Sequence, residues 1–442
     1  ESNQCLLWSY VIIFHRTAAM ANELFTTMRV LSTLVLICAY VENTIEWSLN
    51  PLSWFSRARG CQLKLNSDLN SGHEPIFLVK TRHGFELAMP ELVDEVGMFK
   101  LAKGDTLFVA CPGNNNEIRG FANYNGGSVM SRCVMDKTLE LKGKQVVSSE
   151  LECKNKVFAK LKETEKECGN NIGEEVQLGF EVEGWHPLVT VCYYRSRAET
   201  LHATHILFGS SLLGAEIKEK KKYFIKGPSN IYPGVNPASA YKQQNQRKVF
   251  SQLLGEERAN FILARSYLSR GHLAPDGDFL LGTWQHLAYF YINTAPQWQS
   301  VNGGNWLQLE TLVRNFASSV KQDFIVTTGT YGILELDDIY GYPQKIYLEP
   351  LQESIPVPLL LWKIVADPKK SSCIVFITHN NPFLTEKPST ICNNICHDHG
   401  WSTDLEDVSK GYTYCCSYSE FKGVVDYAPD LDCRSILSNY YV

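Results

Sequence analysis

Two short segments of this 442-residue chain carry residues capable of phosphodiester chemistry. Residues 269–275 contain Arg270 and His272, and residues 291–297 contain Asn293. Hydrolysis of a phosphodiester needs an activated water molecule and neutralisation of charge on the phosphate. An imidazole of ordinary pKa accepts a proton near neutrality, so His272 is the candidate general base. Arg270 offers a permanent charge and a planar set of donors for phosphate oxygens.

A third segment adds candidate groups for a metal ion. Apolar residues recur at steps of three and four from Trp306 to Val320, which predicts a helix over residues 302–320. Asn302 and Glu310 share one side of that helix, roughly 12 Å apart along its axis. An amide oxygen suits Mg²⁺, so Asn302 is the expected ligand and Glu310 the expected holder of water around the ion. Asn302 could instead be a helix N-cap, a role that uses the same oxygen.

Each of these residues has a simpler interpretation when it is taken alone. A single histidine in a turn is more often structural than catalytic, and a single arginine is often a solvated surface group. The catalytic interpretation of His272 and Arg270 therefore depends on the complete set of residues and on its spacing.

The set resembles the signature of the DNA/RNA non-specific endonuclease family. Its parts stand in order as Arg270-Gly271-His272, Asn293-Thr294-Ala295-Pro296-Gln297, Asn302 and Glu310. The resemblance spans roughly residues 185–435. It implies a metal-dependent endonuclease of α+β class, with a ββα-metal finger beside a central antiparallel sheet. It also implies catalytic roles for His272, Arg270, Asn293 and Glu310, and Mg²⁺ or Mn²⁺ bound by Asn302.

Residues 267–272 and 379–382 further resemble the secreted branch of this family that degrades double-stranded RNA in arthropod guts. Ser269 departs from the aspartate that many members carry before the arginine, which bears on positioning more than on chemistry. The family also places an arginine upstream of this motif. Arg247 is the best candidate for it, and an exposed helix arginine is an equally good interpretation.

The net charge of −5 excludes a uniformly basic nucleic-acid binder. Because non-specific affinity for nucleic acid comes mainly from phosphate contacts, a positive surface must be local. The densest basic cluster lies at residues 218–226, so Lys220, Lys221 and Lys222 are predicted to contact nucleic acid. The alternative for this cluster is a solvated loop.

Residues 28–44 read as a signal peptide, because Arg29 precedes a short apolar run. We expect residues 1–27 to be a non-native upstream extension, and the protein to be secreted without stable membrane association. Of 14 cysteines, Cys5 and Cys38 fall in these two segments, which leaves twelve for six disulfides of undetermined pairing. A zinc site built on residues 392–399 is the less favoured alternative.

Residues 45–180 are predicted to form a β-rich amino-terminal domain, with a charged helix near residues 154–168. Residues 181–442 are predicted to form the nuclease domain. Expected strands there cover residues 188–194, 203–208, 324–328, 358–365 and 374–378. Strands mixed irregularly with helices favour the α+β class.

The predicted function is a secreted, Mg²⁺-dependent endonuclease that cuts RNA, including double-stranded RNA, and DNA without sequence specificity. The alternative is a non-catalytic secreted nucleic-acid-binding protein with the same fold. The oligomeric state is left open.

Overall fold

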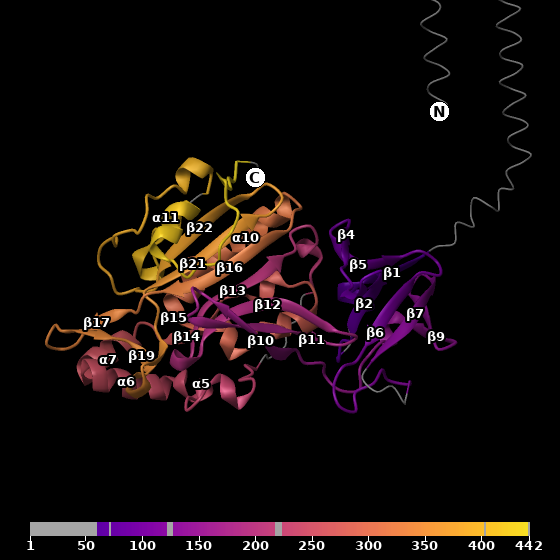
Figure 1. Ribbon diagram of the computed structural model, residues 1–442, viewed down its shortest axis with the longest axis horizontal. Coiled ribbons are helices and arrows are strands. Elements are labelled where there is room, and N and C mark those ends of the chain that lie inside the picture. Colours follow the sequence, from indigo (N-terminus) through magenta and orange to yellow (C-terminus); the bar gives the residue numbers. More distant parts are fainter. Residues whose placement is uncertain (1–59, 70–71, 122–126, 217–222, 402–403, 441–442) are drawn as a thin grey trace, which may run out of the picture. The chain divides into compact units, whose positions relative to one another are not determined.

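The computed structural model describes residues 60–69, 72–121, 127–216, 223–401 and 404–440 (Figure 1). Residues 60–442 form one compact unit. Helices and largely antiparallel sheets are mixed within this unit, so the α+β class is confirmed. Three predictions lie outside the described residues: those for residues 1–27, for residues 28–44 and for Lys220, Lys221 and Lys222.

A nine-stranded sheet forms the centre of the nuclease region. Its strand order is β10-β11-β12-β13-β16-β21-β22-β23, with antiparallel neighbours, and β24 adds to β22 in parallel. The strands are β10 (Lys160–Cys168), β11 (Gly173–Glu181), β12 (Trp185–Tyr194), β13 (Glu199–Leu207), β16 (Phe324–Tyr331), β21 (Leu360–Asp367), β22 (Ser372–His379), β23 (Thr413–Cys416) and β24 (Ser435–Ile436). All five predicted strands are confirmed as β12, β13, β16, β21 and β22. Every residue of β21 and β22 is buried, as expected of apolar strands covered on both faces.

The helix predicted for residues 302–320 is confirmed, with an irregular start. A short helix α9 (Gln299–Val301) leads into the π-helical turn η7 (Asn302–Trp306), and α10 (Leu307–Ser319) follows. Gly304 leaves the helical region, with φ −100° and ψ −121°. A Cβ there would lie 2.8 Å from the Cβ of Lys410, so glycine lets this neighbour approach closely.

Further helices and short hairpins surround the large sheet. The helices are α5 (Pro237–Ala240), α6 (Gln243–Leu254), α7 (Glu256–Leu263), α8 (Gly282–Leu287) and α11 (Tyr418–Val424). The hairpin strands are β14 (Leu268–His272) with β15 (Thr294–Trp298), β17 (Glu335–Asp337) with β18 (Pro343–Lys345), and β19 (Tyr347–Glu349) with β20 (Ser354–Pro356). Helices α6 and α7 lie side by side and directly precede β14 (Figure 1).

The described part of the amino-terminal region is rich in strands, as predicted. One sheet has the order β3-β2-β6-β7-β8-β9 and another the order β1-β5-β4. The elements are β1 (Cys61–Lys64), α4 (Leu65–Asp68), β2 (Ile76–Thr81), β3 (Gly84–Leu87), β4 (Glu91–Val93), β5 (Val96–Leu101), β6 (Thr106–Ala110), β7 (Ser128–Met135), β8 (Thr138–Leu141) and β9 (Lys144–Val147). The backbone N–H of Thr283 donates to Glu74 at 2.6 Å, which links this region to α8. The domain boundary near residue 180 stays a prediction, and the large sheet has strands on both sides of that residue.

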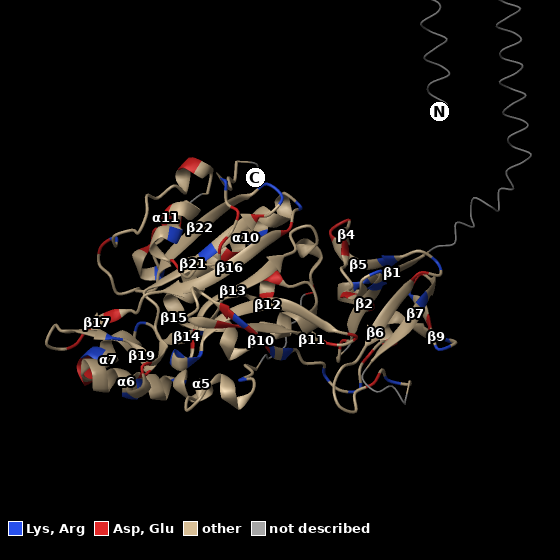
Figure 2. Cartoon of the chain, in the orientation of Figure 1, with Lys and Arg blue, Asp and Glu red and all other residues tan. Residues whose placement is uncertain are grey.

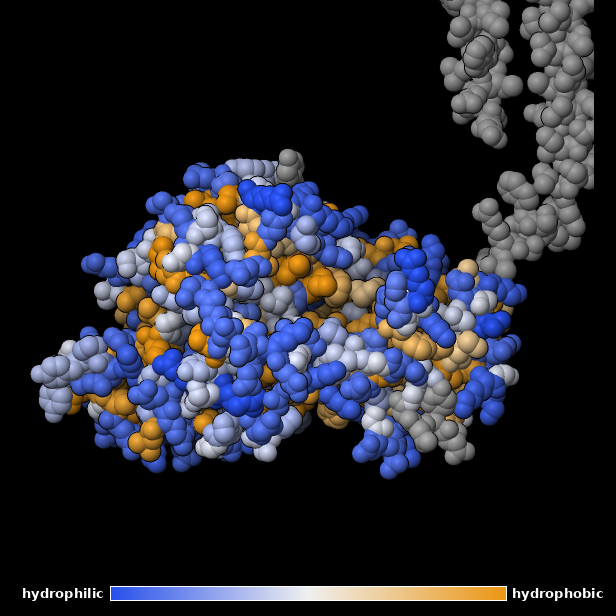
Figure 3. Space-filling model, viewed as in Figure 1, coloured by the Kyte–Doolittle hydropathy of each residue, from blue (hydrophilic) through white to orange (hydrophobic). Residues whose placement is uncertain are grey.

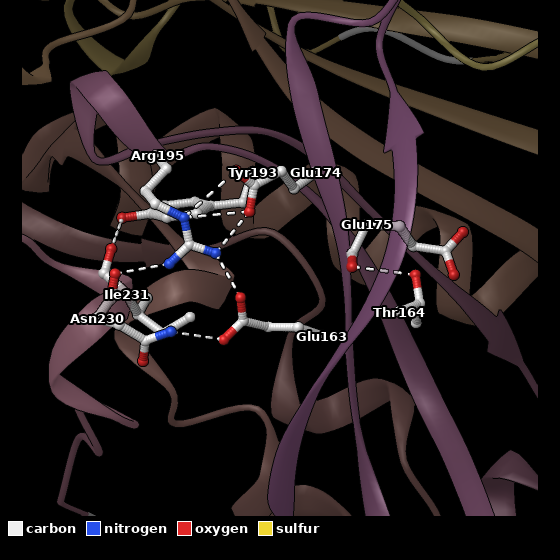
Figure 4. Close-up of polar contacts among 8 residues, drawn as sticks. All are labelled: Glu163, Thr164, Glu174, Glu175, Tyr193, Arg195, Asn230 and Ile231. Carbon is white, nitrogen blue, oxygen red and sulfur yellow. Dashed lines mark hydrogen bonds and ion pairs between the residues drawn. The ribbon is translucent and has the colours of Figure 1, made fainter.

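The prediction of a helix near residues 154–168 was wrong, because residues 160–168 form the edge strand β10. The charged residues of this strand find partners on its neighbours. The guanidinium of Arg195 joins Glu163 of β10 at 2.6 Å to Glu174 of β11 at 2.5 Å, and Thr164 donates to the carbonyl of Glu175 at 3.2 Å (Figure 4). A high charge content favours an exposed helix only when no sheet edge is available, and here β11 supplies one.

All twelve cysteines of residues 60–440 are paired, as predicted. The six disulfides are Cys61–Cys133, Cys111–Cys153, Cys168–Cys192, Cys373–Cys433, Cys392–Cys416 and Cys396–Cys415. Because Cys392 and Cys396 are each bonded to another cysteine, neither offers a thiolate to zinc. The zinc alternative is therefore excluded.

No helix in the described part of the chain is both long and apolar enough to cross a bilayer. The face of the molecule drawn in Figure 3 is largely hydrophilic, with apolar residues scattered between polar ones. Scattered apolar residues of this kind are normal on protein surfaces.

Candidate active site

The hairpin of β14 and β15 places Arg270 and His272 on one face. Alternation along β14 turns both side chains the same way, and His272 stands opposite Thr294 in the pair. Gly271 faces the other side, where a Cβ would lie 2.0 Å from the Cδ of the buried Gln297. Glycine is therefore required between Arg270 and His272, because any side chain would displace Gln297.

Aromatic rings contact the side chains of both Arg270 and His272. The His272 ring meets Tyr289 edge-on at 4.8 Å between centroids and lies 5.4 Å from Phe224. The guanidinium of Arg270 lies 4.7 Å from the Phe224 centroid and donates to the Tyr291 hydroxyl at 3.3 Å. Phe224 thus contacts both residues, and its face attracts the cation.

Asn293 is completely buried, and its side-chain amide forms hydrogen bonds with backbone groups. The amide nitrogen donates to the carbonyls of Ala274 and Ala288 at 2.8 and 2.9 Å, and the amide oxygen accepts from the N–H of Ala274 at 3.0 Å. These bonds close the loop that joins β14 to β15. Asn293 is therefore a positioning residue for His272, and its catalytic role stays a prediction.

Asn302 is half-buried in the turn η7. The helix begins three residues earlier, where Trp298 takes the N-cap position of α9, and Asn302 itself has helical φ and ψ of −59° and −44°. The N-cap alternative is therefore wrong. Among the described residues, none forms a hydrogen bond with the Asn302 side chain, which leaves its amide oxygen available to a ligand.

A cluster of charged side chains surrounds Glu310 on α10. The Arg314 guanidinium lies 3.9 Å from the Glu310 carboxylate and 3.0 Å from that of Asp278, whose other oxygen lies 2.8 Å from Nε2 of His205. The completely buried Lys363 of β21 donates to Thr328 at 2.6 Å and lies 5.1 Å from the Trp306 centroid.

Burial dominates the electrostatics of this cluster. The Glu310 side chain is only 10 % exposed, and burial raises its pKa to about 7. The charges of Lys363 and Arg314 lower that pKa, and those of Asp278 and Asp276 raise it. The pKa of Asp278 is shifted in the opposite direction. Burial would raise it, but His205 and Arg314 outweigh burial and hold this pKa below the ordinary value. The cluster therefore contains a carboxyl that titrates near neutrality beside one that stays ionised.

Tyr289 connects the His272 side of the site to this cluster. Its ring contacts His272, and its hydroxyl donates to the Asp276 carboxylate at 2.8 Å. Asp276 in turn lies close enough to influence the pKa of Glu310. No group of three or more His, Cys, Asp or Glu side chains in the described ranges is placed to bind a metal ion.

A sequence-family model for DNA/RNA non-specific endonucleases matches residues 176–421, which include every element of this site. The chain belongs to the DNA/RNA non-specific endonuclease family. A salivary endonuclease of Lutzomyia longipalpis is 31 % identical over 82 % of this chain and 83 % of its own length. The salivary protein Tsal2A of Glossina morsitans morsitans is 25 % identical over 85 % of this chain and 94 % of its own. A chain of the solved EndoG/EndoGI complex aligns with TM-score 0.34 and 16 % identity over 57 % of this chain and 88 % of its own. The protein is thus a nuclease that acts on nucleic acid.

Arg247, the predicted upstream arginine of this endonuclease, lies exposed on α6. Its guanidinium donates to the side chain of Asn260 on α7, and no described contact joins it to Arg270 or His272. It also lines a cavity of about 310 Å³ together with Tyr267. Its role at the transition state therefore stays a prediction.

Asn380 belongs to residues 379–382, which resemble the secreted branch of the family. Its side chain contacts the backbone of β15. Asn380 is fully buried, accepts from the N–H of Trp298 at 3.1 Å, and donates to the carbonyls of Pro296 and Pro358 at 3.0 Å. It therefore fixes β15, which carries the family's Pro-Gln pair. Ser269, at the position that departs from the family, donates to the carbonyl of Gln297 at 3.0 Å and so also supports the hairpin.

Several residues of the site were absent from the sequence prediction. Asp276 and Asp278 follow His272 closely, and Arg314 stands one helical turn after Glu310, so their spacing could have indicated a role. Phe224 and Lys363 come from remote segments with no motif. Only the fold brings those two residues to the site.

Proposed function

We propose that this protein is a secreted, Mg²⁺-dependent endonuclease that hydrolyses RNA, including double-stranded RNA, and DNA without sequence specificity. The observation that carries the proposal is the hairpin face, where His272 and Arg270 share the ring of Phe224 and connect through Tyr289 and Asp276 to Glu310. A base, a phosphate-binding cation and a carboxylate cluster thus meet in one region.

The chemistry of the Asn302 and Glu310 side chains fits a hydrated Mg²⁺ ion. The Asn302 amide oxygen is a hard donor without a competing bond among the described residues, and Asp276 and Asp278 both disfavour ionisation of Glu310. Asn302 would hold the ion and Glu310 the water around it. A bound Mg²⁺ would supply positive charge for the phosphate and acidify water.

His272 would take the proton of the attacking water molecule, and Tyr289 and Phe224 would keep its ring in place. Arg270 would neutralise the phosphate, held toward it by Phe224 and Tyr291. Asn293 would maintain the loop that sets the position of His272.

Support for secretion comes from the six disulfides, which persist in oxidising compartments, and from the relatives whose names describe salivary proteins. The preference for double-stranded RNA rests on the resemblance of residues 267–272 and 379–382. The chain offers no base-reading motif such as a recognition helix or zinc finger, so we expect sequence-tolerant cutting.

The direct test is incubation of the purified protein with double-stranded RNA, single-stranded RNA and duplex DNA, with EDTA and after return of Mg²⁺ or Mn²⁺. We expect cleavage of all three substrates, loss of cleavage in EDTA and recovery with Mg²⁺. Cleavage that persists in EDTA would contradict the metal proposal. Binding of nucleic acid without any cleavage would favour the non-catalytic alternative.

A further inference from the structure

The arginines of the described chain fall into two groups. Arg119, Arg195, Arg197, Arg314 and Arg434 each form an ion pair with a carboxylate. Arg247, Arg258, Arg265 and Arg270 have no carboxylate partner among the described residues, although they lie within one short stretch of sequence. Arg82 and Arg132 of the amino-terminal region are the remaining unpaired arginines of the described chain. Guanidinium groups left without a carboxylate retain their full charge for an external anion.

Three of these arginines lie on or directly after α6 and α7, whose ribbons in Figure 2 carry basic segments, with acidic segments on α7 as well. We call Arg247, Arg258 and Arg265, with Phe261 and Tyr267, the basic ridge. Arg258 and Arg265 both lie over the ring of Phe261, at 5.5 and 3.5 Å from its centroid. Stacking on the ring orients both guanidinium groups. Arg265 also donates to the carbonyl of Phe261 at 3.0 Å, and the Nε atom of Arg258 is buried, so the remaining N–H groups are those left for an anion.

Aromatic surface accompanies the charge on the ridge. Phe261 is 44 % exposed and Tyr267 is 38 % exposed, so both rings present part of their surface to solvent. Tyr267 and Arg247 also line the cavity of about 310 Å³. Glu256 and Glu257 directly precede Arg258 in the first turn of α7, and neither forms an ion pair with it among the described residues. Cations alternating with exposed aromatic rings are the combination that nucleic acids bind.

The basic ridge is directly connected to the candidate active site along the polypeptide. Tyr267 immediately precedes β14, which ends at His272, so the two are separated by roughly 16 Å of extended strand at about 3.3 Å per residue. A second cavity, of about 550 Å³, joins Arg265 and Ser266 to Gly303 and Lys410, beside Asn302. A length of roughly 16 Å corresponds to about five base pairs at a rise of about 3.4 Å, so a substrate must extend several nucleotides beyond the scissile phosphate to reach the ridge.

We propose that the basic ridge binds the phosphate backbone of the substrate on one side of the cutting position, with Arg258 and Arg265 as the principal contacts. This inference rests on the proposed function and names the surface on which a long substrate docks. It explains how a chain of net charge −5 holds a polyanion, because the positive charge is concentrated next to the hairpin. Because the surface contacts phosphates, it does not read sequence.

The test compares the double variant Arg258→Gln/Arg265→Gln with the matched control Arg82→Gln/Arg132→Gln, whose arginines also lack carboxylate partners among the described residues. Cleavage is measured against salt concentration on a long RNA duplex and on a trinucleotide too short to reach the ridge. We expect the ridge variant to raise KM on the duplex about tenfold and to flatten the logarithmic salt slope by about two, one per lost phosphate contact. Its kcat/KM on the trinucleotide should not change.

Four further measurements make the outcome decisive. The variant Arg258→Lys/Arg265→Lys keeps both charges and should retain most of the salt slope, and equal melting temperatures exclude misfolding. The inference is overturned if the ridge variant behaves like the control, or if Lys220, Lys221 and Lys222 changed to Gln account for the whole slope. If the wild type cuts nothing, the proposed function fails by itself. In that case, duplex binding is measured in EDTA, and the salt dependence of Kd for the wild type and the ridge variant tests the inference. Absence of duplex binding overturns the inference.

Discussion

The finger region (residues 268–319) and the amino-terminal β-rich region (residues 60–157) are held together in different ways. In the finger, amide side chains are completely buried, among them Asn293, Gln297 and Asn305. In the β-rich region the buried positions are mainly apolar, and the disulfides Cys61–Cys133 and Cys111–Cys153 connect its strands. Both regions have an apolar core, to which the finger adds buried amide side chains and the β-rich region adds covalent links.

This difference has an energetic meaning. Both polar atoms of the Gln297 amide are buried without a hydrogen-bond partner among the described residues, and an unsatisfied buried group costs about 1–3 kcal/mol. The finger tolerates this cost where the hairpin packs on Gly271. The β-rich region has its strands tied by cross-links that reduce the entropy of its unfolded chain. We therefore expect substitutions in the finger to alter activity, and those in the β-rich region to alter stability.

The largest difference between an effect on activity and an effect on stability is expected for His272→Ala. Loss of the general base should lower kcat by about 10²–10⁴-fold, because the water molecule then loses its proton acceptor. The melting temperature should stay unchanged, since His272 is only partly buried. His83→Ala, an exposed histidine of the β-rich region, is the matched control and should keep full activity. Near-normal turnover by His272→Ala would remove the base assignment.

Asn302→Ala should act on the metal requirement. We expect the Mg²⁺ concentration for half-maximal activity to rise several-fold, with partial recovery at high Mg²⁺, because one protein ligand is lost. Stability should change little, since Asn302 does not cap the helix. Asn305→Ala is the contrasting control: its amide donates to the carbonyls of Leu405, Asp407 and Gly411, so this variant should lose stability. A stability loss in Asn302→Ala with an unchanged Mg²⁺ titration would assign it a structural role.

Sequence patterns predicted the strands and the long helix of the nuclease region because apolar periodicity there reflects burial. Leu309, Val313 and Phe316 are buried as the pattern requires. The pattern failed at residues 160–168, where the high charge content resembled that of a solvated helix. The partners of Glu163 and Thr164 lie on other strands, and a local reading of sequence does not include them.

The candidate site was predictable to the extent that its residues are close in sequence. His272, Arg270 and Asn302 stand in a motif, and the structure places the first two on a common face of the hairpin. Phe224 and Lys363 reach the site from distant segments, so only tertiary contacts reveal them. The π-helical turn at Asn302 was also missed, because Gly304 departs from regular helical geometry where the distant Lys410 approaches it.

Removal of the Cys111–Cys153 disulfide tests the β-rich side of the comparison. The double variant Cys111→Ser/Cys153→Ser opens a link between residues separated by 42 positions, and its loss should cost about 2–4 kcal/mol of unfolding free energy. Denaturant unfolding measures that loss. Turnover of a trinucleotide by the folded fraction should not change, because the finger keeps its own contacts. A drop in kcat matching that of His272→Ala would show that the two regions are not separable.

The smallest expected effects concern pH, and they have opposite signs in the two regions. Burial raises the pKa of Glu310 to about 7, above its value in the unfolded chain, so the folded state keeps a proton that the unfolded state releases. Stability from this group is present at low pH and is lost as pH rises from about 4.5 to about 7. Burial alone would also raise the pKa of Asp68, but Lys137, the Lys64 N–H and Ser67 hold it below the ordinary value. Stability from Asp68 is therefore present at neutral pH and is lost as pH falls through the range below its unfolded pKa.

Unfolding free energies of Glu310→Gln and Asp68→Asn, measured in EDTA across this pH range, test both signs. Relative to wild type, Glu310→Gln should gain on the order of 1–3 kcal/mol between pH 5 and pH 8, because the wild type loses stability there. Asp68→Asn should be less stable than wild type at neutral pH, and the deficit should shrink as the solution is acidified. If Glu310→Gln followed the wild-type pH profile, the Glu310 carboxyl would titrate at its ordinary pKa. The charged side chains around Glu310 would then not shift its pKa. The finger and the β-rich region would no longer differ in the sign of their pH dependence.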